Sequence, residues 1–272
     1  MNSAAGLRLS MLLAAAAACG KVNDMPPSVD GSISDGPPID AVLGSQNNPA
    51  RTCAELHVAG LPSAVYWLHD AKGDPPFQAY CEQDINGGGW AMVENSVRRA
   101  DGATATFWQF TYADRLRQLG TLAVGQNYYN GSLYLIGTEY MDVFVDLQDK
   151  TAVAAVMTAT GINPSTMQFT MPKLTVGDTS VYTNQFASGW SAQDFDGDAD
   201  AAGNCSTMFS NVAQHYGGCW AYNLGSDADA PVLDGGVGPH VNNTVLTSLG
   251  LALQSGTGSY SQVKRIARFT RW

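Results

Sequence analysis

The chain has 272 residues, of which 45% are hydrophobic and 14% are charged, and its formal net charge is −10. This length is sufficient for one large hydrophobic core, or for one domain with a tail. The negative charge argues against nucleic acid as a partner, because no basic cluster is dense enough to replace phosphate counterions. The low charged fraction and the 29 glycines favour a loop-rich, mostly β extracellular protein over a helical cytosolic one.

The first 18 residues have the pattern of a secretory signal peptide. Arg8 precedes the apolar run LSMLLAAAAA, which is too short to span a bilayer. The small residues before Cys19 resemble the lipobox of bacterial lipoproteins, in which the cysteine receives a lipid anchor and becomes the mature N-terminus. We therefore expect an exported protein, held to the bacterial cell envelope (the outer membrane or cell surface) only by lipid on Cys19. The alternative is an ordinary signal peptide cleaved after an Ala-x-Ala site.

Residues 19–50 are predicted to form a disordered tether, because they are rich in Pro, Gly, Ser, Asn and Asp and lack a hydrophobic period. From residue 51 onward, the runs SAVYWLH, FQAYC and GWAMVEN predict strands separated by the turns GDPP and DINGGG. YADRLRQLG predicts a short helix, and the C-terminal KRIARFTRW predicts a final strand. With no internal repeat and no second linker, one domain is expected over residues 51–272.

The five cysteines are Cys19, Cys53, Cys81, Cys205 and Cys219. If Cys19 carries lipid, the other four form two locally spaced pairs. An even number of cysteines in an exported chain indicates disulfides. Of the three possible pairings, spacing along the chain favours Cys53 with Cys81 and Cys205 with Cys219. The alternative is a zinc site built from all four, although the CxxC spacings that such sites prefer are absent.

The segment CAELHVAGLPSAVYWLHDAKGDPPFQAYCEQDINGGGWAMVEN, residues 53–95, resembles the opening of a fibrinogen C-terminal-like domain. That family begins with a CAE cysteine, continues through a strand and a PFxVYCD motif, and reaches GGGW after an acidic turn. The resemblance implies an α+β fold, mostly antiparallel β with short helices, long loops and two disulfides. The matching residues are Cys53, Ala54, Glu55, Val65, Tyr66, Pro76, Phe77, Tyr80, Cys81, Gly87, Gly88, Gly89 and Trp90.

The same resemblance implies a calcium (Ca²⁺) loop before Cys205. The family's loop has the order Asp-x-Asp-x-(apolar)-x-Gly followed by Asn-Cys. The segment DGDADAAGNC fits this order if its spacing is allowed to differ by one residue. Calcium takes six to eight oxygen ligands, which alternating aspartates on a sharp loop can supply. One register uses the carboxylates of Asp196 and Asp198 with the carbonyls of Asp200 and Ala202. The other uses Asp198 and Asp200 with later carbonyls, and a solvated loop without an ion is the alternative.

Lectins of this family, the ficolins and tachylectins, bind acetylated sugars beside the calcium loop, among aromatic and His side chains. The corresponding segment here is HYGGCWAYNLG. The resemblance implies an aromatic floor made by His215, Tyr216, Trp220 and Tyr222, with Asn223 as a polar contact. The alternative is that these side chains only pack around the second disulfide. Intelectins share the GGGW half of the domain and bind glycan diols directly through calcium.

The sequence contains neither HExxH nor GxSxG, and no cysteine is left over as a nucleophile. We therefore predict a non-enzymatic protein that recognises glycans or acetylated ligands at the bacterial cell surface, with calcium as its cofactor. The alternative is an adhesion or assembly module that binds protein, in which calcium only stiffens the loop. A hydrolase would require a deep cleft with paired carboxylates.

Overall fold

The structure is a computed structural model that describes residues 41–70, 74–98, 104–218, 220–225, 238–254 and 258–272. The predicted signal peptide, Cys19, most of the predicted tether and Cys219 lie outside these residues. Within the described parts of the chain, no helix has both the length and the apolar character needed to cross a bilayer.

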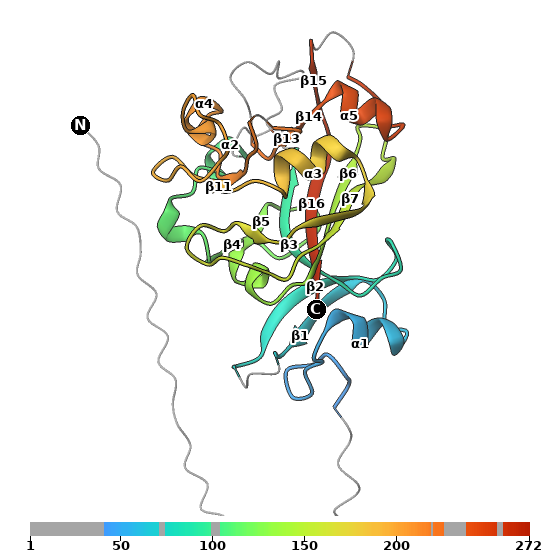
Figure 1. The fold of residues 1–272 in the computed structure, drawn as a ribbon. Coiled ribbons are helices and arrows are strands. Elements are labelled where there is room, and N and C mark those ends of the chain that lie inside the picture. Colours follow the sequence, from blue (N-terminus) through green and yellow to red (C-terminus); the bar gives the residue numbers. More distant parts are fainter. Residues whose placement is uncertain (1–40, 71–73, 99–103, 219, 226–237, 255–257) are drawn as a thin grey trace, which may run out of the picture. The chain divides into compact units, whose positions relative to one another are not determined.

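The main element is an antiparallel sheet. Its strands are β1 (Ala64–Leu68), β2 (Phe77–Glu82), β3 (Trp90–Val97), β4 (Gln118–Gly120), β5 (Tyr128–Asn130), β6 (Glu139–Val145), β7 (Thr151–Thr158), β10 (Lys173–Gly177) and β16 (Arg265–Arg271). In the described residues these nine strands have the order β1-β2-β3-β16-β6-β7-β10, with β5 also pairing β3 and β4 pairing β5 (Figure 1). The predicted final strand, β16, thus lies at the centre of the sheet, between β3 and β6.

Short helices and small sheets complete the described fold. The helices are α1 (Cys53–Val58), α2 (Thr104–Phe107), η1 (Tyr112–Asp114), η2 (Gly131–Leu135), α3 (Thr179–Gln185), α4 (Cys205–Met208) and α5 (Asn243–Ser248). The small strands are β8 (Gly161–Ile162), β9 (Phe169–Thr170), β11 (Trp190–Ser191), β12 (Gln214–His215), β13 (Tyr222–Asn223), β14 (His240–Asn242) and β15 (Tyr260–Gln262). The predicted α+β class with mostly antiparallel strands is confirmed.

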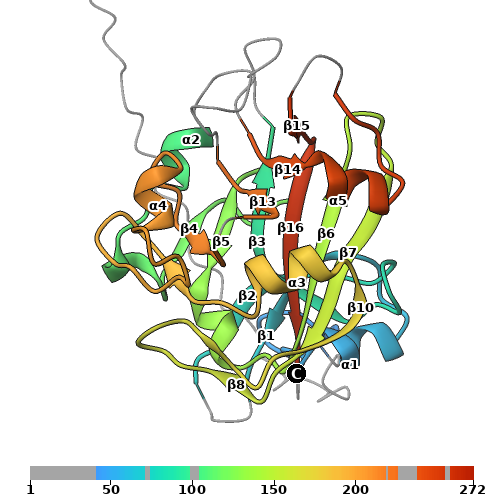
Figure 2. The ribbon, with the colours of Figure 1, turned by 45° about the horizontal axis from the view of Figure 1, so that its top comes forward.

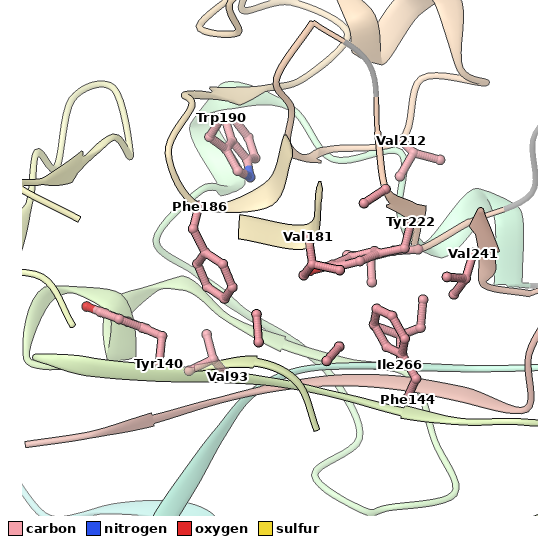
Figure 3. Close-up of a cluster of buried hydrophobic side chains, with 14 of the residues drawn as sticks. Val93, Tyr140, Phe144, Val181, Phe186, Trp190, Val212, Tyr222, Val241 and Ile266 are labelled. Atoms are coloured by element: carbon pink, nitrogen blue, oxygen red, sulfur yellow. The ribbon is translucent and has the colours of Figure 1, made fainter. Parts of the chain in front are cut away.

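Hydrophobic side chains alternate between the two faces of the sheet. Ile266 of β16 lies in the larger core together with Val181 of α3 and Leu246 of α5. The helices α3 and α5 lie over one face of the sheet (Figure 2), and Figure 3 shows Val181 and Ile266 in the buried cluster. Ala267 and Phe269 lie in a second cluster on the opposite face. This period of two is the pattern expected of a strand buried on both faces.

The predicted disulfide between Cys53 and Cys81 is confirmed, and it connects α1 to β2. Close to it, the three glycines of the GGGW motif all have positive φ angles. A Cβ atom on Gly89 would lie 2.9 Å from the Cα atom of Ala54, so the turn can approach α1 only without a side chain. The triple glycine is therefore a backbone requirement of this corner.

Two expectations are corrected. The compact unit begins at Ala41, not at residue 51, because the last residues of the predicted tether pair with β1: Trp67 N donates to Gly44 O at 2.8 Å and Ala50 N donates to Trp67 O at 3.0 Å. In the predicted helix YADRLRQLG only the three residues of η1 are helical. The rest of that segment turns away because Gln118–Gly120 pair with β5.

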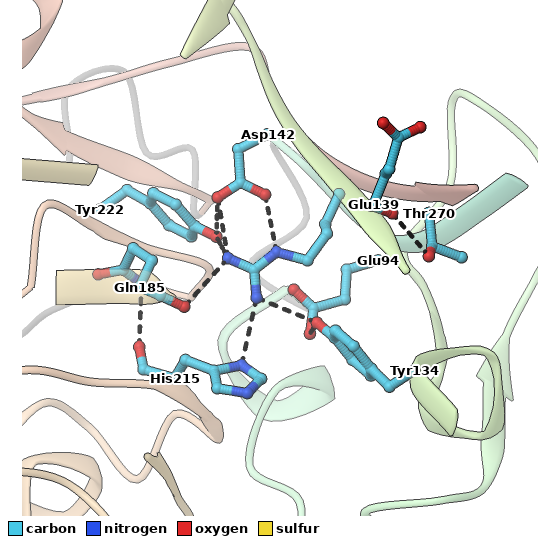
Figure 4. A network of polar contacts seen from close by, with 9 residues as sticks. Glu94, Tyr134, Glu139, Asp142, Gln185, His215, Tyr222 and Thr270 are labelled. Carbon is cyan, nitrogen blue, oxygen red and sulfur yellow. Dashed lines mark hydrogen bonds and ion pairs between the residues drawn. The ribbon is translucent and has the colours of Figure 1, made fainter. Parts of the chain in front are cut away.

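A buried ion pair lies at the centre of the main sheet. Arg268 of β16 is directly opposite Glu94 of β3 on one side and Asp142 of β6 on the other. Its Nε and Nη2 atoms donate to the two oxygens of Asp142 at 2.7 and 2.8 Å, and both side chains are at most 1% exposed (Figure 4). Burial alone would lower the pKa of Arg268, but the Asp142 carboxylate raises it well above its usual range, so the pair stays charged.

Replacing Arg268 by methionine should lower the free energy of unfolding by about 3–5 kcal/mol, because Asp142 would remain as an uncompensated buried charge. Urea denaturation at neutral pH, followed by circular dichroism, measures this loss. The matched control is Arg271→Met on the same strand, whose pair with Glu139 is about one-third exposed (31% and 34%) and should contribute at most about 1 kcal/mol. Equal small losses in both variants would contradict the assignment of Arg268 as the central contact.

Candidate functional site

Residues 194–204 contain four aspartates, and we call this segment the acidic loop. Burial and the neighbouring carboxylates of Asp198 and Asp200 raise the pKa of Asp196. Like charges that raise a carboxyl pKa are close enough to repel each other, and a cation would relieve that repulsion. The carboxylates of Asp196, Asp198 and Asp200 therefore lie near enough to affect one another electrostatically.

Asp198 is the internal anchor of the acidic loop. Its Oδ2 atom accepts hydrogen bonds from Ser191 Oγ at 2.8 Å and from the Cys205 N–H at 2.9 Å. Its Oδ1 atom accepts from the Asp200 N–H at 2.9 Å, and Asp200 in turn accepts from the Ala202 N–H at 2.9 Å. These bonds wrap the backbone around carboxylates and connect the loop to β11 and α4.

The donor set of the acidic loop suits a hard cation, since each carboxylate oxygen can accept more than one contact. Asp196 is exposed, and Asp198 and Asp200 are half-buried. In the described residues, however, no group of three or more His, Cys, Asp or Glu side chains converges closely enough to form a ready metal site. Calcium binding by Asp196, Asp198, Asp200 and Ala202 stays a prediction.

Beside the acidic loop lies a pair of surface aromatic rings that sequence reasoning missed. Phe195 of the loop stacks on Tyr112 of η1 with ring centroids 4.5 Å apart, and the Arg115 guanidinium lies 4.0 Å from the Tyr112 ring centroid. Asp194 Oδ1 accepts from the Tyr112 N–H at 2.7 Å and holds the two segments together. All three ring and guanidinium side chains are half-buried. We call Tyr112, Arg115 and Phe195 the aromatic ledge.

The five residues predicted to form the ligand pocket are buried instead. They are His215, Tyr216, Trp220, Tyr222 and Asn223, none more than 4% exposed. Tyr216 and Trp220 pack against Cys205 in a small cluster, which matches the alternative of packing around the second disulfide. The other three lie on short paired strands: His215 is on β12, which pairs with β11, and Tyr222 and Asn223 are on β13, which pairs with β14. The pairing of Cys205 with Cys219 stays a prediction, because Cys219 lies outside the described residues.

His215 belongs to the polar network around Arg268 (Figure 4). Its Nε2 lies 2.7 Å from the Met167 carbonyl, which only accepts, so Nε2 carries the proton. The Nδ1 atom then accepts from Arg268 Nη1 at 3.2 Å. Burial and the Arg268 charge lower the pKa of His215 to about 3. The imidazole is therefore neutral at physiological pH, and it is enclosed within the network, with 1% of its surface exposed.

Tyr222 and Tyr134 connect the network to its two carboxylates. Tyr222 Oη donates to Asp142 at 2.8 Å and accepts from Arg268 at 2.7 Å. Tyr134 Oη donates to Glu94 at 2.6 Å and accepts from Arg268 at 3.1 Å. Because Asp142 takes the bidentate contact, Glu94 is the surplus carboxylate, and burial raises its pKa.

A separate pocket of about 370 Å³ lies against η2. Asp70, Asp74 and Phe77 line one part of it, and Asn130 and Ser132 line another. Carboxylates, an amide, a hydroxyl and an aromatic ring are groups that bind sugars, but none of these residues was predicted from the sequence. Two carboxylates in one pocket are also the feature that a hydrolase would require.

No model of a known protein family matches the chain. Human angiopoietin-1 is 32% identical over 59 residues, which is 21% of this chain and 11% of that protein. Mouse angiopoietin-2 is 33% identical over 64 residues, which is 23% of this chain and 12% of that protein. The matched segment therefore spans about a tenth of the length of these curated relatives.

Two solved structures resemble the whole described domain. The fibrinogen-like globe domain of human ANGPTL6 has a TM-score of 0.55 and 20% identity, over 82% of this chain and 96% of that chain. The fibrinogen-like globe domain of human ANGPTL2 has a TM-score of 0.56 and 18% identity, over 82% of this chain and 99% of that chain. At these identities the likeness shows the fold.

The buried carboxyl of Glu94 predicts a pH dependence. Because its folded pKa is raised, its contribution to stability is fully present below the ordinary glutamate pKa and is lost as the pH rises through the raised value. Glu94→Gln keeps an oxygen that accepts the hydrogen bond from Tyr134, and it removes the loss of stability that ionisation of Glu94 causes as the pH rises. Urea unfolding at pH 4 and pH 7 should show the variant gaining stability relative to the native chain as pH rises. Glu139→Gln, at a half-exposed site, is the control and should show no such gain. If the native chain is more stable than Glu94→Gln at pH 7, the assignment of a raised pKa to Glu94 is wrong.

Proposed function

Because residues 41–272 adopt the fold of a fibrinogen-like globe domain, we propose that the protein is a non-catalytic recognition module that binds glycans or acetylated ligands outside the cell. The observation that carries this proposal is the aromatic ledge, where Phe195 and Tyr112 stack at 4.5 Å and Asp194 of the acidic loop hydrogen-bonds Tyr112. Aromatic faces receive the apolar side of a sugar ring, and neighbouring charged groups bind its hydroxyls.

Calcium, when bound, would neutralise the acidic loop and supply a hard Lewis-acidic centre for oxygen ligands. In one register the carboxylates of Asp196 and Asp198 would hold it, with the carbonyls of Asp200 and Ala202. In the other register the carboxylates of Asp198 and Asp200 would hold it, with later carbonyls. Phe195 immediately precedes Asp196 in the chain, so an ordered loop also fixes one ring of the ledge. Calcium in this proposal supports recognition by holding the binding surface in place.

The proposed location is the outside of a bacterial cell, reached through the signal peptide of residues 1–18 and retained by lipid on Cys19. Residues 20–40 would then separate the domain from the membrane. This arrangement suits a protein that captures ligands near the cell surface, because the anchor confines many copies to a plane and favours multivalent binding.

A protein-binding adhesion module is a second candidate, and the edge of the main sheet at β10 favours it. The edge at β1 is covered by residues 44–50, whereas in the described residues no strand pairs the outer side of β10. Val176 of β10 and Met171 just before it are 59% and 77% exposed. An uncovered edge strand can receive an added strand from a partner.

Calorimetric titration of calcium into the full chain tests the metal site. Saturable binding is expected, weakened at least tenfold by Asp198→Asn, which removes the carboxylate common to both registers. Asp196→Asn and Asp200→Asn then distinguish the two registers. Asp196→Asn removes a carboxylate ligand only in the first register, and Asp200→Asn removes one only in the second. Asp149→Asn, an exposed aspartate outside the loop, should leave binding unchanged. If the native chain gives neither heat nor a calcium-dependent rise in melting temperature, the aspartates form a solvated loop.

A glycan array in calcium and in chelator tests recognition. We expect binding that chelator reduces, and a loss of at least tenfold for Tyr112→Ala because it removes one ring of the ledge. Tyr66→Ala, on the distant edge strand β1, is the matched aromatic control and should retain affinity. If Tyr112→Ala binds as tightly as the native chain, the ledge is not the site. Cleavage of a bound glycan, abolished by Asp70→Asn with Asp74→Asn, would instead support a hydrolase.

A further inference from the structure

A pocket of about 370 Å³ lies where β3 and β6 end and β16 begins. Arg265, the first residue of β16, is directly opposite Val97 of β3 and Val145 of β6, and all three line the pocket. The turn at residues 124–125 forms another wall. Arg98, Lys264 and Asp149 also line the pocket, so its described lining includes three basic residues and one acidic residue, and Arg98 Nε donates to Gln262 Oε1 at 2.7 Å. We call it the basic pocket.

The Arg265 guanidinium is held in place by groups that do not neutralise it. Its Nε atom donates to Asn95 Oδ1 at 2.5 Å, and one terminal nitrogen lies 3.7 Å from the sulfur of Met92. Asn95 is fully buried, and its amide nitrogen donates to the carbonyls of Val124 and Gln126 at 2.9 and 2.6 Å. The asparagine therefore cannot rotate freely, and it fixes the orientation of the arginine.

Arg265 differs in this respect from the other arginines of its strand. Arg268 hydrogen-bonds Asp142, and Arg271 hydrogen-bonds Glu139. Within the described residues, no carboxylate hydrogen-bonds Arg265; Glu82 acts on it only through space. Burial lowers the pKa of this half-buried guanidinium, while Tyr80 and Glu82 act in the opposite direction through space without a hydrogen bond to it. Such a group is stabilised by an anion that enters the pocket.

Lys264 supplies a second cation at the mouth of the pocket. Its ammonium group pairs with Asp149, and the two side chains are 52% and 71% exposed. An exposed pair of this kind is weak and exchanges readily, so an incoming anion can compete with Asp149 for Lys264. The carboxylate of Asp149 therefore opposes anion binding, and removing this carboxylate should raise the affinity of the pocket for an anion.

We propose that the basic pocket binds the carboxylate of a small organic acid, with Arg265 as the fixed anion-binding residue and Lys264 as the exposed one. A planar guanidinium pairs bidentately with a carboxylate, which favours this group over other anions of the same charge. Val97 and Val145 provide apolar walls for the carbon part of the ligand. The volume is at the small end of ligand pockets and admits a free acid or one acidic sugar unit of a glycan.

Calorimetric titration of the full chain with three probes tests this proposal: glucuronate, isobutyrate, and glucose as the uncharged counterpart of glucuronate. We expect saturable binding of at least one carboxylate, no binding of glucose, and an affinity that falls as salt is added. Tight binding of glucuronate alone would identify an acidic sugar as the ligand, whereas isobutyrate alone would identify a free acid.

Three variants locate the site. Lys264→Glu should weaken binding at least tenfold, and Arg265→Lys should do the same because it loses the bidentate contact. Asp149→Asn should strengthen binding about twofold or more, since it removes the competing carboxylate. Asn readily adopts the positive φ of 66° at this position, so the turn is preserved.

The melting temperature of each variant reports whether it folds. If Arg265→Lys does not fold, the two exposed variants still decide the question, because neither contributes to the core. The proposal is overturned if neither carboxylate binds saturably at millimolar concentration, if glucose binds as well as glucuronate, or if Lys264→Glu and Asp149→Asn leave the affinity unchanged.

Discussion

The ion pair between Arg268 and Asp142 is the contact on which the rest of the domain depends. Two neighbouring strands place a carboxylate opposite each side of Arg268, and its guanidinium also reaches His215 of β12, Tyr222 of β13 and the carbonyl of Gln185 in α3. One buried cation thus connects the central strand to the small strands and the helix that cover the sheet. A charge in this position is stable only while its partners stay in place, so the network couples the covering layer to the sheet.

The two candidate binding features belong to opposite faces of the sheet. Phe195 packs at the margin of the larger core, on the face toward which Ile266 and Arg268 point. Arg265 alternates with Ile266 and therefore shares its face with Ala267 and the second cluster. A glycan on the aromatic ledge and an acid in the basic pocket would not compete for space, and each can be tested without disturbing the other.

The features predicted correctly from the sequence are those encoded locally. The disulfide between Cys53 and Cys81, the glycine turn before Trp90 and the final strand all depend on short motifs or on alternation. The helix predicted at YADRLRQLG was wrong beyond η1, because tertiary pairing with β5 outweighed local propensity.

The candidate site was predicted less well because its contacts are distant in sequence. Asp194 and Tyr112 are 82 residues apart, and Arg268 and Asp142 are 126 apart, so no spacing rule relates them. Aromatic residues near a cysteine were interpreted as a ligand floor, yet the identity of a residue does not reveal whether strand pairing will bury it. His215 on β12 and Tyr222 on β13 are both buried in the interior, which their residue types alone did not indicate.

The position of β16 in the chain has a consequence for how the protein is made. Its seven residues are synthesised after β3 and β6, the two strands with which they pair, and they form the middle of the sheet and contribute Arg268 to the core. Until they are available, β3 and β6 each lack their neighbour, and the earlier part of the chain cannot close its sheet. The middle of the sheet can therefore form only after β16 has been synthesised, with contacts between the first and last thirds of the domain forming late. During that interval the edges of β3 and β6 that β16 later occupies stay open, and an open strand edge is a place where two copies of a chain can pair wrongly with each other.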